Sequence, residues 1–346
     1  MASTGTPHLE AISQGSGLVL DQVDGARPHL VYWTCSLKGT RVCLALYMDS
    51  WVSSEAHAAV EQVVIHVHGK DRDAGSAWTY MHIARSSLPL EEQRKVLVLA
   101  PQFFNGLDKL RFCSFKEDAL LVWKGNSWGD GSASVCGKDD GGVSSFEPLD
   151  ILLLHFSNPL VYPSMKRIVF LAGHSLGGQL INRYCILSPS SCTMREGMSV
   201  EYVIMNPASY LYFSAERKQF VVPVSLVLLL IRCFLLMTPE DYLRRFLERK
   251  VHLMYGEKDQ GLGDKSLEAM SQGMCKLHLI HPPPPTVALK TILTITSLHN
   301  VGATRMERAK NYHWHLCGME KQISWLGPRS WSFDCICNVG HDSCLM

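Results

Sequence analysis

Short apolar runs recur along the chain, and most of them show little alternation between apolar and polar positions. Six runs stand out: residues 62–67, 96–100, 167–172, 200–205, 251–255 and, more weakly, 333–339. Strands that are buried on both faces of a parallel sheet have this pattern. The runs therefore predict a mostly parallel sheet, and we expect the second strand to stop at Pro101.

Helical patterns lie between these runs, at residues 74–85, 149–156, 176–187 and 239–249. The last one begins with Thr238 as a candidate N-cap and Pro239 in the first turn. Alternating strands and helices predict an α/β fold with a doubly wound sheet and helices on both faces. We expect residues 1–60 to supply N-terminal strands and loops, and residues 61–346 to form the main domain.

Three segments depart from this pattern. Residues 126–143 are rich in Gly, Ser and Asp and predict a long surface loop. Residues 221–237 are mostly apolar, and residues 275–302 contain four consecutive prolines. We interpret the insertions near 218–238 and 274–302 as a cap after the fourth strand or as translated non-coding sequence. A membrane span at 221–237 is a third interpretation, although that run is shorter than the roughly 20 residues a span needs.

Composition narrows the classes of function. Lys and Arg number 33 against 32 for Asp and Glu, so the net charge is +1 and offers no basic excess for nucleic acid. The hydrophobic fraction of 47% can build a sizeable core, which excludes a disordered chain. The 12 cysteines form no Cys-x-x-Cys pair, so we interpret Cys335 and Cys337 as buried thiols and expect no metal site. Residues 1–30 lack the pattern of a secretory signal, so we expect an intracellular, cytoplasmic protein.

The strongest motif is Gly173-His174-Ser175-Leu176-Gly177-Gly178, which matches G-x-S-x-G between a predicted strand and a predicted helix. A serine at such a sharp turn exposes its hydroxyl above the sheet, and Gly173 and Gly177 provide space for the crowded backbone. The N-terminus of the following helix would favour a developing oxyanion.

These residues resemble the nucleophile turn of the α/β-hydrolase superfamily, in its serine esterase-like branch. His68-Gly69-Lys70 resembles that family's HG turn, and Arg72-Asp73 resembles a pair that follows it in some esterase-like members. The resemblance implies that Ser175 is the nucleophile. It also implies that the backbone N–H groups of Leu176 and of Lys70, or alternatively Asp71, form the oxyanion hole.

The same resemblance implies an acid and then a histidine later in the chain. Asp259 follows the fifth apolar run in a G-x-x-D pattern, with Glu257 and Asp264 as alternatives. His341 follows the sixth run and is the expected base. Its rivals are His313 and His315, within a helical pattern, and His174, which is beside the serine and expected to be packed.

The resemblance thus implies a serine hydrolase that cleaves a small-molecule carboxylic ester through Ser175, His341 and Asp259, without a cofactor. Only five residues follow His341, where the family has a helix. The alternative is therefore a catalytically inactive α/β-hydrolase-fold protein that serves as a binding module. The sequence predicts neither the substrate's acyl and alcohol groups nor the oligomeric state.

Overall fold

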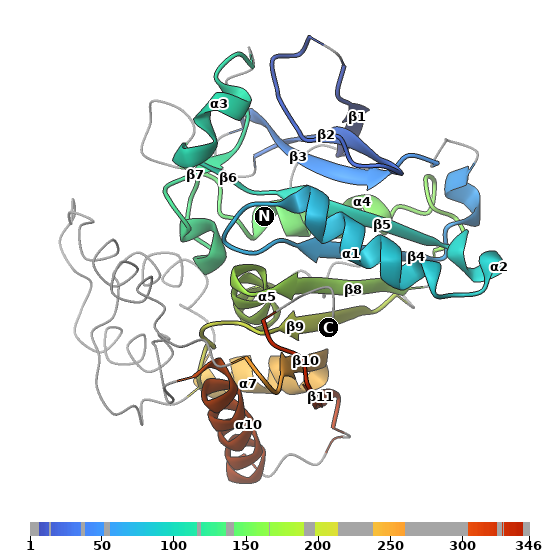
Figure 1. The fold of residues 1–346 in the computed structure, drawn as a ribbon. Helices are drawn as coiled ribbons and strands as arrows, with labels where there is room; N and C mark the ends of the chain where they lie inside the picture. Colours follow the sequence, from blue (N-terminus) through green and yellow to red (C-terminus); the bar gives the residue numbers. More distant parts are fainter. Residues whose placement is uncertain are drawn as a thin grey trace. The chain divides into compact units, whose positions relative to one another are not determined.

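Figure 1 shows the computed structural model of the chain. Its residues group into two compact units. The first unit is Met1–Ile181 with Ser188–Val203, and the second is Asn182–Leu187 with Ile204–Met346. The structure describes residues 7–13, 15–35, 39–51, 56–115, 119–135, 142–165, 167–189, 198–213, 238–259, 304–323, 327 and 329–341. Most of the proposed insertions near 218–238 and 274–302 lies outside these residues.

The first unit begins with an antiparallel part. Strands β1 (His8–Ala11), β2 (Ala26–Thr34) and β3 (Arg41–Asp49) pair in that order, and β3 continues antiparallel to β5 (Val96–Gln102). Strand β3 is buried along its length except at its first residue. The expected N-terminal strands are therefore present, while the boundary between residues 60 and 61 stays a prediction.

Parallel strands follow in the order β5, β4 (Gln62–Val67), β8 (Arg167–His174) and β9 (Val200–Met205). Strand β4 pairs parallel to both β5 and β8. The expected stop at Pro101 is wrong, because β5 continues to Gln102. Pairing between β4 and β5 ends at Leu99, so the missing N–H of Pro101 breaks no ladder hydrogen bond on that side.

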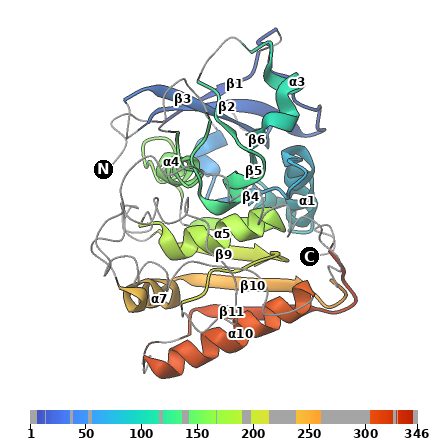
Figure 2. The ribbon, with the colours of Figure 1, turned by 90° about the vertical axis from the view of Figure 1, so that its left-hand side faces the viewer.

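Helices cover both faces of this sheet. Helix α1 (Ala74–Ser86) packs against β3, β4 and β5, and α4 (Glu147–Phe156) lies on the opposite side in both views (Figures 1 and 2). The short helices are α2 (Leu90–Gln93), α3 (Lys109–Phe112), η1 (Ala56–Ala59), η2 (Gly106–Asp108) and η3 (Ser127–Asp130). Strands β6 (Phe104–Asn105) and β7 (Val122–Trp123) form a separate two-stranded sheet.

The second unit contains the end of β9, then β10 (Lys250–Gly256) and β11 (Trp331–Ile336), which pair in parallel. Helix α7 (Pro239–Glu248) begins at the predicted cap, where Thr238 Oγ1 accepts a hydrogen bond from the Asp241 amide at 3.2 Å. Helix α10 (Arg305–Gln322) packs on β11, with the ring of His313 4.1 Å from that of Phe333 between centroids. Helix α5 (Leu176–Leu187) contributes residues to both units.

The predicted fold class is confirmed: the strands are mostly parallel and helices connect them. Two local predictions are wrong. Trp128 and Val143 are buried, so residues 126–143 are not simply a surface loop. Cys335 and Cys337 are exposed rather than buried: Cys335 is near the end of β11, the last strand in the sheet order, and Cys337 lies just beyond that strand. Among the described residues, none of the helices is long and apolar enough to cross a membrane; residues 221–237 lie outside them.

Candidate active site

Ser175 occupies the turn between β8 and α5 in the first unit. Its φ is +57°, a left-handed conformation that non-glycine residues rarely adopt. The residue is 7% exposed and belongs to the buried polar groups. Strained backbone of this kind is concentrated at functional sites, so the turn is a candidate site on geometry alone.

The glycines on either side of Ser175 are required by close backbone contacts. A Cβ at Gly173 would lie 2.4 Å from the carbonyl oxygen of Gly177. A Cβ at Gly177 would lie 2.3 Å from the carbonyl oxygen of Val67, at the end of β4. Any side chain at either position would force the backbone apart. The turn is therefore packed directly on the carboxyl end of the neighbouring strand.

The loop after β4 lies beside the serine. A Cβ at Gly69 would be 3.7 Å from Ser175 Cβ, which is an ordinary van der Waals distance. The Arg72 amide donates to the carbonyl of Gly69 at 3.2 Å and closes a turn with Lys70 and Asp71 at its centre. Both candidate donors of the oxyanion hole from this loop, Lys70 and Asp71, are therefore in one tight turn next to Ser175.

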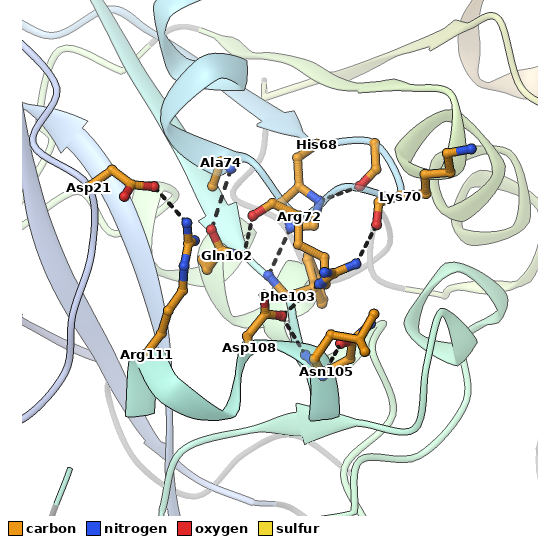
Figure 3. A network of polar contacts seen from close by, with 12 residues as sticks. Asp21, His68, Lys70, Arg72, Ala74, Gln102, Phe103, Asn105, Asp108 and Arg111 are labelled. Carbon is orange, nitrogen blue, oxygen red and sulfur yellow. Dashed lines mark hydrogen bonds and ion pairs between the residues drawn. The ribbon is translucent and has the colours of Figure 1, made fainter. Parts of the chain in front are cut away.

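His68 fixes the start of this turn. The Phe103 amide donates to His68 Nε2 at 2.9 Å, and Nδ1 is 2.8 Å from the carbonyl of Gly69 (Figure 3). Because an amide can only donate and a carbonyl can only accept, the imidazole is the neutral tautomer with its proton on Nδ1. Burial lowers the pKa of His68 to about 4, which agrees with a neutral ring. His68 therefore has a structural role, because both of its ring nitrogens take part in hydrogen bonds.

Arg72 ties the other end of the turn to a second loop. Its Nε is 2.6 Å from Asp108 Oδ2, and its Nη1 donates to the carbonyl of Lys70 at 2.6 Å (Figure 3). Arg72 itself has a φ of +59°. Gln102 stabilises this conformation, because its side-chain amide donates to the Arg72 carbonyl at 2.9 Å. Sequence reasoning noted the Arg-Asp dipeptide but missed Asp108 and Gln102, which are distant in the chain.

A third segment, η3, packs against the residue after the serine. A Cβ at Gly129 would lie 2.6 Å from Leu176 Cδ1. The Trp128 ring stacks on Phe103 with centroids 5.2 Å apart and meets His68 edge-on at 4.8 Å. Sequence reasoning missed this support; a tryptophan within a stretch of small polar residues was the available signal, since tryptophan is usually well buried.

The second unit brings Asp259 and His341 together. Nδ1 of His341 is 2.7 Å from Asp259 Oδ2, and the carboxylate side chain is 1% exposed against 31% for the imidazole. Arg305 Nη1 is 3.5 Å from the other carboxylate oxygen, Oδ1. A buried carboxylate needs such partners to offset its lost hydration.

Backbone contacts hold the His341 loop against the end of β10. The Lys258 amide donates to the carbonyl of Val339 at 2.8 Å. A Cβ at Gly256 would lie 2.4 Å from the carbonyl oxygens of Val339 and Gly340, so only glycine permits this approach. Asn206, with a φ of +44°, accepts from the Gly256 amide at 2.8 Å and donates to the carbonyl of Gly340 at 3.2 Å. Sequence reasoning missed Asn206, although an Asn-Pro pair directly after a strand indicates a special turn.

The rival residues have other contacts. Glu257 is exposed and accepts from the Asn338 amide at 3.0 Å. Asp264 lies outside the described residues. His315 Nε2 accepts from the Phe213 amide at 3.1 Å, and His313 packs edge-on against Trp331 and Phe333. His174 is buried in the turn, as expected.

The structure thus brings together two separate sets of predicted residues. Gly69, Lys70, Ser175 and Leu176 belong to the first unit, and Asp259 and His341 belong to the second. The approach of His341 to Ser175 remains a prediction. Within the ranges that the structure describes, there is no group of three His, Cys, Asp or Glu side chains that could hold a metal ion.

Comparisons with known proteins give similarities at low identity. No family model and no curated protein matches the chain. An S-formylglutathione hydrolase from Staphylococcus aureus has 13% identity over 92% of this chain and 93% of its own, with a TM-score of 0.40. The siderophore hydrolase EstB from Aspergillus nidulans has 13% identity over 94% of each chain, with a TM-score of 0.40.

An IroE-like serine hydrolase from Shewanella oneidensis has 11% identity over 91% of this chain and 75% of its own, with a TM-score of 0.42. These three structural neighbours are hydrolases, and the one from Shewanella oneidensis is a serine hydrolase. At these identities and TM-scores, the similarity carries no inference about activity.

The neutral state of His68 predicts how stability depends on pH. Its folded pKa of about 4 lies below the ordinary value of 6.5, so the unfolded chain binds a proton first as the pH falls. The free energy of unfolding should therefore decrease from pH 6.5 toward pH 4. In His68→Gln, which cannot titrate there, urea denaturation should show a slope smaller by up to about 1.4 kcal/mol per pH unit. Equal slopes in the variant and the parent would contradict the neutral assignment.

Proposed function

We propose that this protein is a serine hydrolase that cleaves a small-molecule carboxylic ester through Ser175, His341 and Asp259. The observation that carries the proposal is the 2.7 Å contact between His341 Nδ1 and Asp259 Oδ2, in the loops that follow two parallel strands. A histidine oriented by a buried carboxylate is the general base of a catalytic triad. Ser175, Asp259 and His341 also follow the chain order of the α/β-hydrolase triad.

The tautomer of His341 follows from its partner. A carboxylate can only accept hydrogen bonds, so the proton of the neutral imidazole is on Nδ1, which leaves Nε2 as the basic nitrogen. In the proposed reaction Nε2 accepts the Ser175 hydroxyl proton as Oγ attacks the ester carbonyl. The Asp259 carboxylate then stabilises the imidazolium that forms.

The tetrahedral intermediate needs hydrogen-bond donors for its oxyanion. The proposed donors are the backbone N–H groups of Leu176, at the start of α5, and of Lys70 or Asp71, in the turn beside Ser175. The N-terminus of α5 adds a partial positive charge to this position. Such preorganised donors contribute more to rate than donors of the same kind in water.

The reaction then has two halves. Collapse of the first intermediate breaks the ester C–O bond, and the leaving alkoxide takes the proton from His341, which leaves an acyl group on Ser175. Water attacks the acyl carbonyl while His341 accepts its proton. In the second collapse the bond to Ser175 Oγ breaks, His341 returns the proton to that oxygen, and the carboxylic acid is released. Apart from the ester and water, the proposed chemistry uses only side chains and backbone amides of this chain.

Replacement of the nucleophile tests the proposal most simply. Ser175→Ala should abolish covalent labelling by a fluorophosphonate and lower kcat for a simple ester by on the order of 10⁶. Ser157→Ala, which removes a buried hydroxyl whose bond is to the Leu154 carbonyl, is the matched control and should label at the parent rate. Activity retained in Ser175→Ala would contradict the proposal, and a folded parent that never labels would favour the binding-protein alternative.

Replacement of the acid tests the role of Asp259 against its neighbour Glu257. An asparagine side chain at position 259 would offer an amide N–H₂ to His341 Nδ1 and would favour the wrong tautomer, so Asp259→Asn should lower kcat by about 10⁴. Glu257→Gln should leave kcat within a few-fold of the parent, because Glu257 is exposed and contacts only a backbone amide in the described hydrogen bonds. Steady-state kinetics on the same ester would compare kcat of Asp259→Asn with kcat of Glu257→Gln. A larger loss in Glu257→Gln would reassign the acid.

A further inference from the structure

The turn after β4, residues 69–72, is held in place by hydrogen bonds to its carbonyl groups. The carbonyl of Gly69 accepts from the Arg72 amide at 3.2 Å and lies 2.8 Å from His68 Nδ1. The carbonyl of Lys70 accepts from Arg72 Nη1 at 2.6 Å. The two successive carbonyls that precede the Lys70 and Asp71 amides are therefore both held by donors from His68 and Arg72.

A hydrogen bond that holds a carbonyl group in place also fixes the direction of the N–H group in the same peptide unit. A trans peptide unit is planar, and its C=O and N–H groups point in opposite directions. The structure contains no cis peptide bonds among the residues it describes. The bond to the Gly69 carbonyl thus orients the Lys70 N–H, and the bond to the Lys70 carbonyl orients the Asp71 N–H. Both N–H groups are directed away from the groups that bind the carbonyls.

Arg72 can do this because its own position is fixed from two sides. Its guanidinium pairs with Asp108 at 2.6 Å, and the two side chains are only 13% and 8% exposed, so water screens the pair weakly. The same oxygen of Asp108 accepts from the Asn105 amide at 3.0 Å, which anchors the carboxylate to the backbone of the neighbouring loop. Gln102 holds the Arg72 carbonyl at 2.9 Å and the Ala74 amide at 3.4 Å (Figure 3).

We infer that Arg72 is a positioning residue, held by Asp108, whose guanidinium fixes the Lys70 carbonyl and thereby orients the Asp71 N–H, one of the two proposed turn donors, toward the oxyanion formed at Ser175. The inference rests on the proposed function and deepens it. In this role Arg72 acts through the turn and not on the substrate itself: its Nε binds Asp108 and its Nη1 binds the Lys70 carbonyl. Its effect is on the transition state alone, since the donors of an oxyanion hole act where charge develops.

The experiment compares Arg72→Met, Arg72→Lys and Asp108→Asn with the parent. Arg72→Met should lower kcat for 4-nitrophenyl acetate about 100-fold with KM within about threefold, as loss of one oriented donor predicts. Arg72→Lys keeps the charge and should recover part of that loss. Asp108→Asn should lower kcat about tenfold. The double variant Arg72→Met/Asp108→Asn should be no slower than Arg72→Met alone, because the two residues act as one unit.

A transition-state analogue separates positioning from a merely structural role. A trifluoromethyl ketone forms an adduct with the active serine in which the ketone oxygen becomes the oxyanion. Its inhibition constant should rise in each variant by the same factor by which kcat/KM falls. Circular dichroism and thermal melting establish which variants are folded; Asp108→Asn preserves side-chain shape and keeps the test valid if Arg72→Met does not fold.

Arg111 provides the matched control. Its Nη2 is 2.7 Å from Asp21 Oδ2, in the same region, but the side chains are 32% and 70% exposed and the pair does not touch the turn (Figure 3). Arg111→Met should therefore retain the parent kcat. Folded Arg72→Met, Arg72→Lys and Asp108→Asn variants with kcat and inhibition constants like those of Arg111→Met would overturn the inference while the proposed function stands. A parent that neither hydrolyses the ester nor labels with a fluorophosphonate would overturn both.

Discussion

A serine with a φ of +57° joins β8 to α5, and the backbone has no room for a Cβ two residues before it, at Gly173, or two residues after it, at Gly177. The carbonyl of Val67 would lie 2.3 Å from a Cβ at Gly177, so the turn is seated on the end of β4. The chain that follows β4 passes close to the serine as well, because a Cβ at Gly69 would lie 3.7 Å from Ser175 Cβ. The strain at Ser175 persists since the surrounding parallel strands and two glycines over-determine it.

Around this turn, polar groups that are distant in sequence form hydrogen bonds and ion pairs with one another. His68 is neutral because an amide donates to one ring nitrogen, and Arg72 is immobilised because a nearly buried carboxylate faces it. In the second unit, Asp259 is buried but has both its oxygens within reach of cationic or N–H groups, from His341 and Arg305. In each unit, buried polar side chains with specific partners define the geometry of the candidate site. Leaving such a group buried without a hydrogen-bond partner would cost free energy, so the partners have to be in place.

The sequence predicted those parts of the site that local physics determines. The strand, serine and helix pattern at residues 167–187 and the cap at Thr238 depend on neighbours in the chain, and the apolar runs indicated the parallel strands. Asp108, Gln102, Trp128 and Asn206 were missed because their roles arise only when loops from different strands meet. Pro101 was misjudged because the pattern does not reveal where pairing between two strands ends.

The proposed function requires that the turn at Ser175 and the Asp259–His341 pair form one active centre. An experimental structure of the protein after reaction with a fluorophosphonate would measure this directly. We expect phosphorus on Ser175 Oγ, His341 Nε2 within about 2.6–3.2 Å of that oxygen or of a phosphoryl substituent, and a phosphoryl oxygen about 2.7–3.1 Å from the Leu176 amide nitrogen. A label on another residue, or a His341 ring beyond hydrogen-bond reach of the adduct, would contradict the proposal.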